Sequence, residues 1–205
     1  MKIYTINIKD VKKMNTAELE ALMPERMKKS STYRFEEDRL RSIGAGYLIM
    51  KYLGPDDESF IEKNQYGKLF VKGYPDFNIS HSGDYAVFAK AEEGVIGIDI
   101  EQVKQRNLKV ANKVFSDRER EWMSEDELNR FHILWTLKES VMKALGKGLS
   151  LTFTSFEVLD FNNDIPVKVE DKELYLYSRE FEGYYIALAV QVPVKNIELI
   201  HSIQT

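Results

Sequence analysis

The stretch over residues 75–101 constrains the fold of this chain more than any other. It contains PDFNIS, YAVFAKA and VIGIDIE, and turn-forming residues separate these three segments at 82–84 and 93–94. Short segments of this kind with tight turns between them predict strands in an antiparallel meander. A meander needs helices or another sheet to cover its apolar face.

Helical patterns occur on both sides of this meander. Apolar side chains recur at helical spacing over 33–53, which Gly54-Pro55 ends, and again over about 126–145. Strands are also expected at 2–8, at 66–72 and, later in the chain, in FTSFEVLD, PVKVE, ELYLYS, YYIALAVQV and IELI, with shorter helices near 16, over 107–114 and from 116. The pattern predicts an α+β fold in two halves, 1–103 and 104–205, each packing helices on a mainly antiparallel sheet.

Composition excludes several classes of function. The net charge of the 205 residues is −4, which does not indicate a general binder of nucleic acid or of membrane surfaces. The chain has no cysteine, which excludes disulfides, thiolate zinc sites and a cysteine nucleophile. No apolar run approaches the roughly 20 residues that cross a bilayer. We therefore expect a soluble protein of the cytoplasm.

Two carboxylates interrupt the apolar strand VIGIDIE. Asp99 and Glu101 point to the same face, about 6.6 Å apart along the backbone. Glu139 and Lys143 share one face of the later helix, at a spacing of four residues. Three acids from two elements would suit Mg²⁺, which prefers oxygen ligands, and Gly97 would leave room for a ligand. The alternative is a solvated strand face and an ordinary surface ion pair.

Three further motifs have both a functional and a structural interpretation. Ser80, His81 and their neighbours in SHSG could surround a phosphate, or form a polar hairpin turn. Basic residues between 26 and 41 could bind phosphate, or line a solvated helix face. Ser116 and Glu119 have the spacing of a capping box, which would explain both residues. The sequence contains neither a phosphate-binding P-loop nor a complete dinucleotide fingerprint.

Taken in order, FNISHSG, GIDIE, FSDRERE and LWTLKESVMKALGKGL resemble the motifs of the 4′-phosphopantetheinyl transferases, especially the longer Sfp-like kind. The resemblance runs from the KIY strand to the last strands, and its motifs lie between Pro24 and Leu149. It implies two similar halves in a pseudo-twofold arrangement. It also implies an enzyme that moves the phosphopantetheine arm of coenzyme A onto a serine of an apo acyl or peptidyl carrier protein, releasing 3′,5′-ADP.

The resemblance also assigns roles to particular residues. Asp99, Glu101 and Glu139 match its Mg²⁺ ligands, and Glu119 matches its proposed general base, a role that competes with the capping box. Lys143 would neutralise the diphosphate of coenzyme A. The other residues implied in coenzyme binding are Arg26, Lys29, Arg41, Gly67, Lys68, Ser80, His81 and Lys138.

Two other classes of function are compatible with the same residues. One is a non-catalytic module that binds a nucleotide or coenzyme A through the cation cluster. The other is an interaction protein that uses its strands as a docking surface. By analogy with the family, in which one chain supplies both halves, we expect a monomer. The carrier protein and its pathway are not indicated by the sequence.

Overall fold

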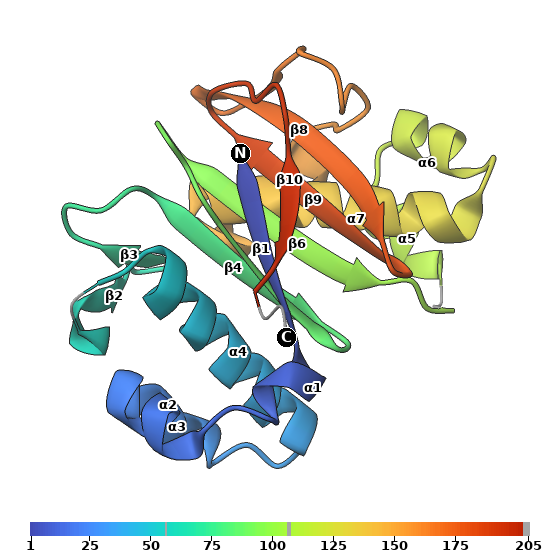
Figure 1. The fold of residues 1–205 in the computed structure, drawn as a ribbon. Helices are drawn as coiled ribbons and strands as arrows, with labels where there is room; N and C mark the ends of the chain where they lie inside the picture. Colours follow the sequence, from blue (N-terminus) through green and yellow to red (C-terminus); the bar gives the residue numbers. More distant parts are fainter. Residues whose placement is uncertain (56, 106–107, 203–205) are drawn as a thin grey trace.

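The computed structural model describes residues 1–55, 57–105 and 108–202. Its strands form two four-stranded sheets and one hairpin (Figure 1). The first sheet has the order β10-β1-β5-β4, and the second has the order β6-β9-β8-β7. Their strands are β1 (Lys2–Asn7), β4 (Phe77–Ser82), β5 (Tyr85–Lys90) and β10 (Glu198–His201), and β6 (Ile96–Gln102), β7 (Val167–Val169), β8 (Lys172–Phe181) and β9 (Tyr184–Val190).

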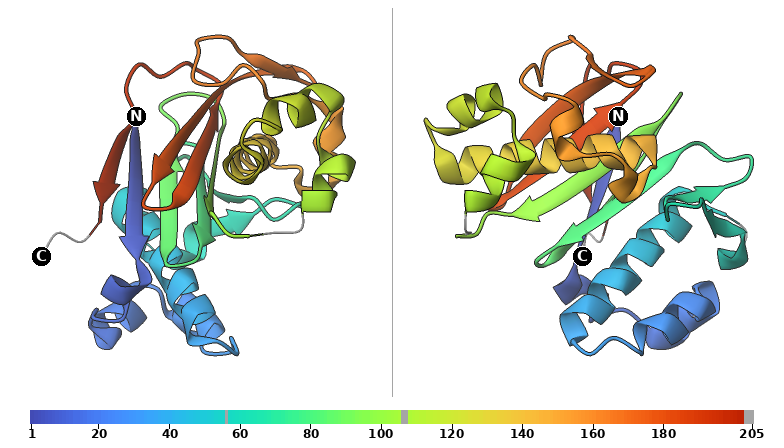
Figure 2. Two further views of the ribbon diagram at one scale, coloured as in Figure 1. Left: turned by 90° about the vertical axis from the view of Figure 1, so that its right-hand side faces the viewer. Right: turned by 180° about the vertical axis from the view of Figure 1, so that it is seen from behind.

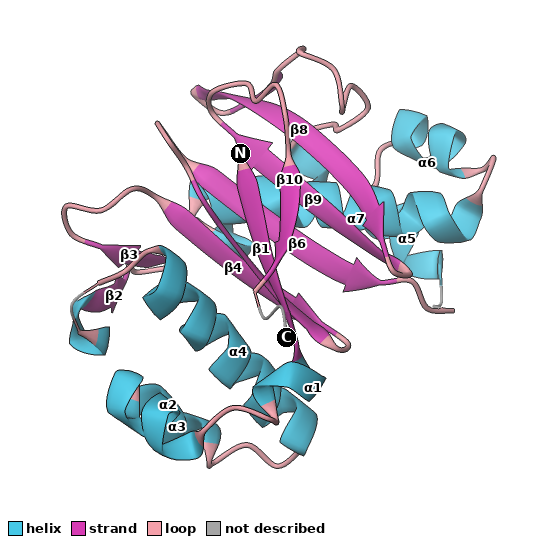
Figure 3. Cartoon of the chain, in the orientation of Figure 1, coloured by secondary structure: helices cyan, strands magenta, loops and turns pink. Residues whose placement is uncertain are grey.

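Helices connect and flank the strands (Figure 3). Two of them are long, α4 (Glu36–Tyr52) and α7 (Glu127–Leu145). The short helices are α1 (Ile8–Val11), α2 (Thr16–Leu22), α3 (Pro24–Ser30), α5 (Ala111–Val114) and α6 (Asp117–Met123), and single 3₁₀ turns lie at Glu58–Phe60, Leu108–Val110, Gly148–Ser150 and Phe153–Ser155. Among the described residues, no helix is both long and apolar enough to span a bilayer.

The two large sheets repeat one connectivity. In the first, β1 is followed by α4 and the hairpin β4–β5, and β5 returns to pair antiparallel with β1. In the second, β6 is followed by α7 and the hairpin β8–β9, and β9 returns to pair antiparallel with β6. This repetition agrees with the expected α+β fold of two similar halves. Only β10 departs from antiparallel pairing among the described pairs, since it runs parallel to β1.

The sheets pack face to face with a long helix on each outer side. One apolar cluster joins α4 to β1 and β5, a second fills the space between the sheets, and a third joins α7 to β8 and β9. In the left view of Figure 2, α7 appears end-on, and β1 lies on the opposite side of the second sheet. Helix α7 is buried on nearly all sides, because α6 and the segment over 151–158 cover its outer face.

The expected three-stranded meander is wrong in its third strand. Strands β4 and β5 pair as predicted, but β6 pairs with β9 rather than with β5. Side chains of β4 and the residue before it accept hydrogen bonds from the outer edge of β6, the last strand of its sheet: Asp76 from Ile96 N (2.8 Å), Asn78 from Ile98 N (3.1 Å) and Ser82 from Gln102 N (3.1 Å). This polar seam, formed by Asp76, Asn78, Ser80 and Ser82, joins the two sheets. The acid-bearing strand thus belongs to the sheet of residues 167–190, although the expected division at 103 groups it with the first half.

The expectation that Gly97 leaves room for a ligand is also wrong. A Cβ atom at Gly97 would collide with the carbonyl oxygen of Ser140 and the backbone of Ala144. The missing side chain therefore lets α7 approach β6 closely. That approach brings the helix face of Glu139 and Lys143 to the strand that carries Asp99.

Other expected elements differ in extent. The helix expected over about 126–145 and the strands from PVKVE onward are confirmed. The segment FTSFEVLD instead holds a single 3₁₀ turn at Phe153–Ser155 and no strand. The strand expected at 66–72 is only β3 (Leu69–Val71), and it pairs with β2 (Ile61–Lys63), which was not predicted. Of the helix expected over 107–114, residue 107 lies outside the described residues, and the remainder is a 3₁₀ turn followed by α5.

Candidate active site

A cavity of about 570 Å³ lies where α3, α4, the β2–β3 hairpin, β4 and the end of α7 meet. Basic side chains predominate on its wall: Arg26, Lys29, Lys63, Lys68, Lys143 and His81. Asp38 and Glu139 are its acidic lining residues. Such an excess of cations around a concave site favours an anionic ligand.

Arg26 is a half-buried cation of this wall. Its side chain crosses Gly46 of α4, where a Cβ atom would overlap it, so the glycine makes room for the guanidinium group. Nη1 donates to Ser42 O at 3.3 Å, and Glu58 lies 3.7 Å from Nε. Nε itself is buried without a hydrogen-bond acceptor, and desolvation lowers the pKa of Arg26. An unsatisfied buried donor is costly, and the positive charge of this guanidinium group attracts an anion to the cavity.

His81, on β4, also lines the cavity. Desolvation lowers its pKa, and the positive charges of Lys143 and Arg41 lower it further. Arg41 does not line the cavity. It donates to Gly83 O at 2.7 Å and pairs with Asp38 at 2.5 Å, so it fastens α4 to the β4–β5 turn beside His81.

Lys68 contacts three acceptors behind the wall of the cavity. Its Nζ donates to Asp76 Oδ2 (2.6 Å), Ala144 O (3.0 Å) and Ile96 O (3.1 Å). Desolvation lowers its pKa although Asp76 opposes the shift. Lys68 thus ties the β2–β3 hairpin, and with it Gly67, to β6 and to the end of α7. Its ammonium group is engaged in this link, while the adjoining backbone faces the cavity.

The acidic strand lies beside the cavity. Asp99 is buried, with 5% of its surface exposed, and its Oδ1 accepts hydrogen bonds from Lys143 Nζ (2.6 Å) and Ser80 Oγ (2.7 Å). Lys143 also donates to Ser80 Oγ at 2.8 Å. The second carboxylate oxygen of Asp99, Oδ2, is buried and has no hydrogen-bond partner among the residues that the structure describes. Ser80 therefore contacts the carboxylate and the lysine rather than lining the cavity.

The other two acids lie close enough to influence one another. Ser82 Oγ donates to Glu101 Oε2 at 3.2 Å. The pKa of Glu139 is raised, first by desolvation and then by the negative charges of Asp99 and Glu101, while Lys143 opposes the shift. The three carboxylates thus share one electrostatic environment, in which an additional cation would relieve their repulsion.

These residues have the chemistry of a magnesium site but not its final arrangement. In the part of the chain that the structure describes, no three acidic, histidine or cysteine side chains are gathered as metal ligands. Two observations nevertheless fit a hard cation: the unpartnered Oδ2 of Asp99 and the repulsion that raises the pKa of Glu139. In this structure, Lys143 is the cation that pairs with Asp99.

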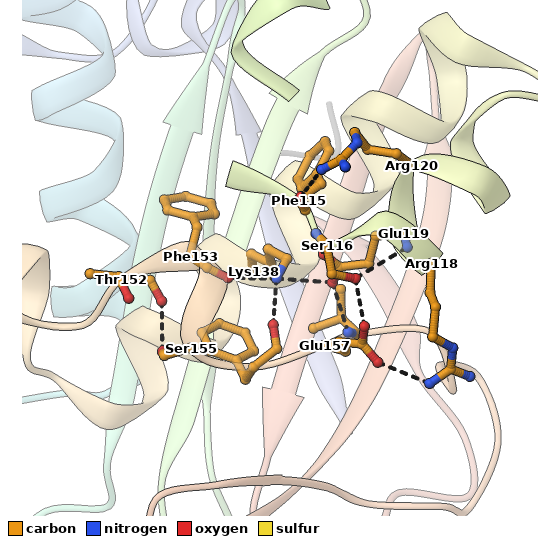
Figure 4. A network of polar contacts seen from close by, with 12 residues as sticks. Phe115, Ser116, Arg118, Glu119, Arg120, Lys138, Thr152, Phe153, Ser155 and Glu157 are labelled. Carbon is orange, nitrogen blue, oxygen red and sulfur yellow. Dashed lines mark hydrogen bonds and ion pairs between the residues drawn. The ribbon is translucent and has the colours of Figure 1, made fainter. Parts of the chain in front are cut away.

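Glu119 and Lys138 are placed elsewhere, in a buried network under α6 (Figure 4). The capping box is confirmed: Ser116 N donates to Glu119 Oε2 at 2.8 Å. Val158 N donates to the other oxygen, which also pairs with Lys138 at 2.9 Å. Lys138 Nζ donates to Phe153 O and Phe156 O, both at 2.6 Å. Desolvation lowers the pKa of Lys138, against the charge of Glu119.

The structure therefore divides the expected site residues into three groups. Seven line the cavity: Arg26, Lys29, Gly67, Lys68, His81, Glu139 and Lys143. Four support its floor or edge: Arg41, Ser80, Asp99 and Glu101. Glu119 and Lys138 are fully buried and pair with each other instead. Lys63 and the seam residue Asn78 were not singled out from the sequence, although the alternating polar side chains of DFNISHS were the available signal for Asn78.

Known proteins resemble this chain in sequence. Residues 95–189 match the 4′-phosphopantetheinyl transferase superfamily. The 4′-phosphopantetheinyl transferase Gsp of Aneurinibacillus migulanus is 35% identical over 72% of this chain and 67% of its own length. The 4′-phosphopantetheinyl transferase Sfp of Bacillus subtilis is 32% identical over 94% and 93%.

A solved structure, the holo-[acyl-carrier-protein] synthase of Helicobacter pylori in complex with coenzyme A, covers 46% of this chain and 97% of that protein at 22% identity. Its TM-score of 0.40 is too low to support an argument about fold or ligand. The two transferases named above are sufficient to assign the family, since each alignment covers most of this chain and most of the relative. The protein belongs to the 4′-phosphopantetheinyl transferase superfamily.

Proposed function

We propose that the protein transfers the 4′-phosphopantetheine group of coenzyme A to a serine of an apo acyl or peptidyl carrier protein. The serine oxygen forms a bond to the phosphorus on the pantetheine side of the diphosphate. The bond from that phosphorus to the bridging oxygen breaks, and 3′,5′-ADP leaves. The membership of the chain in the superfamily supports this reaction.

One structural observation supports it most strongly: a cation-lined cavity with an unsatisfied buried donor adjoins a cluster of carboxylates. Coenzyme A carries two separate anionic groups, a 3′-phosphate and a diphosphate. We assign the 3′-phosphate to the side of Arg26, Lys29 and His81. The diphosphate would lie toward Lys143 and Glu139, at the other end of the cavity.

The chain's residues would mainly position charge in this reaction, as is usual in phosphoryl transfer. Lys143 would neutralise the diphosphate, and Gly67 would offer backbone to the nucleotide. Asp99, Glu101 and Glu139 would hold Mg²⁺, which supplies additional neutralisation of the diphosphate when bound. The hydroxyl groups of Ser80 and Ser82 would keep two of these carboxylates oriented.

The proton of the attacking serine also needs an acceptor. Glu119 could serve only if its carboxylate left Lys138 and two backbone N–H groups. The buried network therefore favours a structural role for Glu119 and a water molecule at the site as the initial proton acceptor.

The test is incubation with coenzyme A, Mg²⁺ and a panel of apo acyl and peptidyl carrier proteins, followed by intact-mass measurement. We expect at least one carrier to gain the mass of phosphopantetheine, and we expect the gain to disappear with a serine-to-alanine carrier. Binding of coenzyme A without transfer to any carrier would instead support a non-catalytic binding module. A monomeric state and a cytoplasmic location remain parts of this proposal.

A further inference from the structure

Asp99, a proposed metal ligand, is already paired with a lysine of the same chain. Its side chain is nearly buried, and a buried carboxylate needs a compensating charge. The structure supplies that charge from the chain itself. Lys143 Nζ lies 2.6 Å from Oδ1, and Ser80 bridges the same two groups, so the three side chains form a closed set of hydrogen bonds.

This compensation is incomplete. Among the described residues, the buried Oδ2 atom of Asp99 has no hydrogen-bond partner. The ammonium group thus contacts one oxygen of Asp99 and leaves the other able to bind a further cation. At the same time, that ammonium group is bound to Oδ1, so a metal ion that takes this oxygen as a ligand must displace it.

The ammonium group of Lys143 could also bind an anion in the cavity. Its side chain is 28% exposed and lines the cavity that Arg26 and His81 share. A lysine ammonium is a compact charge on a flexible stem, so it can turn from a carboxylate to a nearby anion without movement of the helix. The other lysine pair of α7, at Lys138, offers no such alternative because both partners are fully buried.

We propose that Lys143 is a built-in counter-ion that competes with the divalent cation for Asp99 and is released when the diphosphate of coenzyme A enters the cavity. This inference rests on the proposed function of the same site. It predicts that metal and coenzyme bind cooperatively. The diphosphate draws Lys143 away from Asp99, which frees Asp99 for the metal ion. The metal ion likewise displaces Lys143 from Asp99, which frees the lysine for the diphosphate. Such coupling must be reciprocal.

The test uses Mn²⁺ as the metal and calorimetry or electron paramagnetic resonance as the readout, in the full-length protein without carrier. Lys143→Met should bind Mn²⁺ about 10-fold more tightly than the unaltered protein when coenzyme A is absent. Lys147→Met is the matched control. It removes the same charge nearby, but Lys147 pairs with Glu170 on the surface, so its Mn²⁺ affinity should stay unchanged.

The second measurement is the effect of coenzyme A on Mn²⁺ affinity. In the unaltered protein coenzyme A should tighten Mn²⁺ binding by more than the factor it produces in Lys143→Met. Lys143→Gln, which keeps a donor for Asp99, serves if the methionine variant does not fold. Mn²⁺ binding to the folded variants that is equal to or weaker than in the unaltered protein would overturn the inference.

The outcome is separable from that of the proposed function. Transfer to a carrier by the unaltered protein, together with unchanged Mn²⁺ affinity in the variants, would reject the counter-ion and leave the function standing. Tighter Mn²⁺ binding in the variants without any transfer by the unaltered protein would support the counter-ion and reject the function.

Discussion

Two lysines of α7 each form an ion pair with a carboxylate, and the two pairs differ in burial and in surroundings. Lys138 pairs with Glu119 at 2.9 Å, and neither side chain is exposed. Lys143 pairs with Asp99 at 2.6 Å, and it reaches the cavity. The two lysines are five residues apart, which places them about 140° apart around the helix. One pair therefore faces α6 and the segment after α7, while the other faces the strand of the acids.

The difference between the pairs lies in how completely their atoms are satisfied. Both oxygens of Glu119 have backbone donors, and Lys138 donates to two backbone carbonyls. Asp99 keeps one oxygen without a partner. A saturated buried pair holds elements together, whereas an unsaturated pair beside a cavity can exchange partners with a ligand. A lysine paired with a carboxylate thus serves structure in one place and, on our proposal, function in the other.

The largest effect is expected from breaking the saturated pair. Glu119→Gln leaves Lys138 as an uncompensated buried charge, so we expect the free energy of unfolding to fall by about 3–5 kcal/mol. Urea unfolding followed by circular dichroism would measure it. Glu157→Gln is the control: this carboxylate belongs to the same network but is 39% exposed, and its loss should cost about 1 kcal/mol or less.

The same variant separates the two roles of Glu119. If Glu119→Gln unfolds like the unaltered protein and yet loses carrier modification, with a changed pH profile, the residue is a base and the contrast between the pairs fails.

The next largest effect is expected on transfer rather than on stability. Asp99→Asn keeps the shape of the side chain but removes the charge that would hold the metal. We expect the rate of carrier modification to fall by about 100-fold or more, with coenzyme A binding largely retained. Rates from mass spectrometry and binding by calorimetry would check this. A variant that keeps both its rate and its Mg²⁺ requirement would remove Asp99 from the site.

A smaller effect is expected at the opposite end of the cavity. Arg26→Met removes a buried donor, so affinity for coenzyme A should fall by about 10-fold, while affinity for 3′-dephospho-coenzyme A should change little. Lys28→Met is the control, because Lys28 is exposed on the same helix and does not line the cavity. Equal losses for both ligands would place Arg26 away from the 3′-phosphate.

The smallest effect concerns pH. Desolvation and the charges of Lys143 and Arg41 lower the pKa of His81 in the free protein. A bound phosphate would raise that pKa, so binding takes up a proton. Affinity for coenzyme A should therefore be highest below the free-protein pKa and decrease as the pH rises through the pKa of the complex, by about three-fold. His81→Gln should lose this part of the pH dependence; if calorimetry shows the same dependence in both proteins, another group is responsible.

Some of this structure was predictable from local sequence patterns. The stripe of Leu134, Leu137, Val141 and Leu145 predicts α7 correctly, since apolar side chains at that spacing need a core. The first three are fully buried, and Leu145 is partly buried. The capping box predicts the start of α6. The family resemblance adds the site residues, most of which the fold gathers around one cavity.

Other features depended on contacts between distant segments. Nothing local to VIGIDIE indicates that it leaves its neighbours to pair with residues 184–190, because alternation does not specify a partner strand. Gly97 has the same limitation: the space that it leaves is taken by a helix more than 40 residues later in the chain. The opposite roles of Lys138 and Lys143 likewise require knowledge of what lies on each side of α7.

The most direct test of the account is a crystal structure of the protein with coenzyme A and Mn²⁺, using anomalous scattering to locate the metal. We predict Mn²⁺ in contact with Asp99 and Glu139, the coenzyme in the cavity beside Arg26, and the Lys143 ammonium group on the diphosphate. A coenzyme bound outside this cavity, or Lys143 still paired with Asp99 beside an acid cluster without metal, would contradict it.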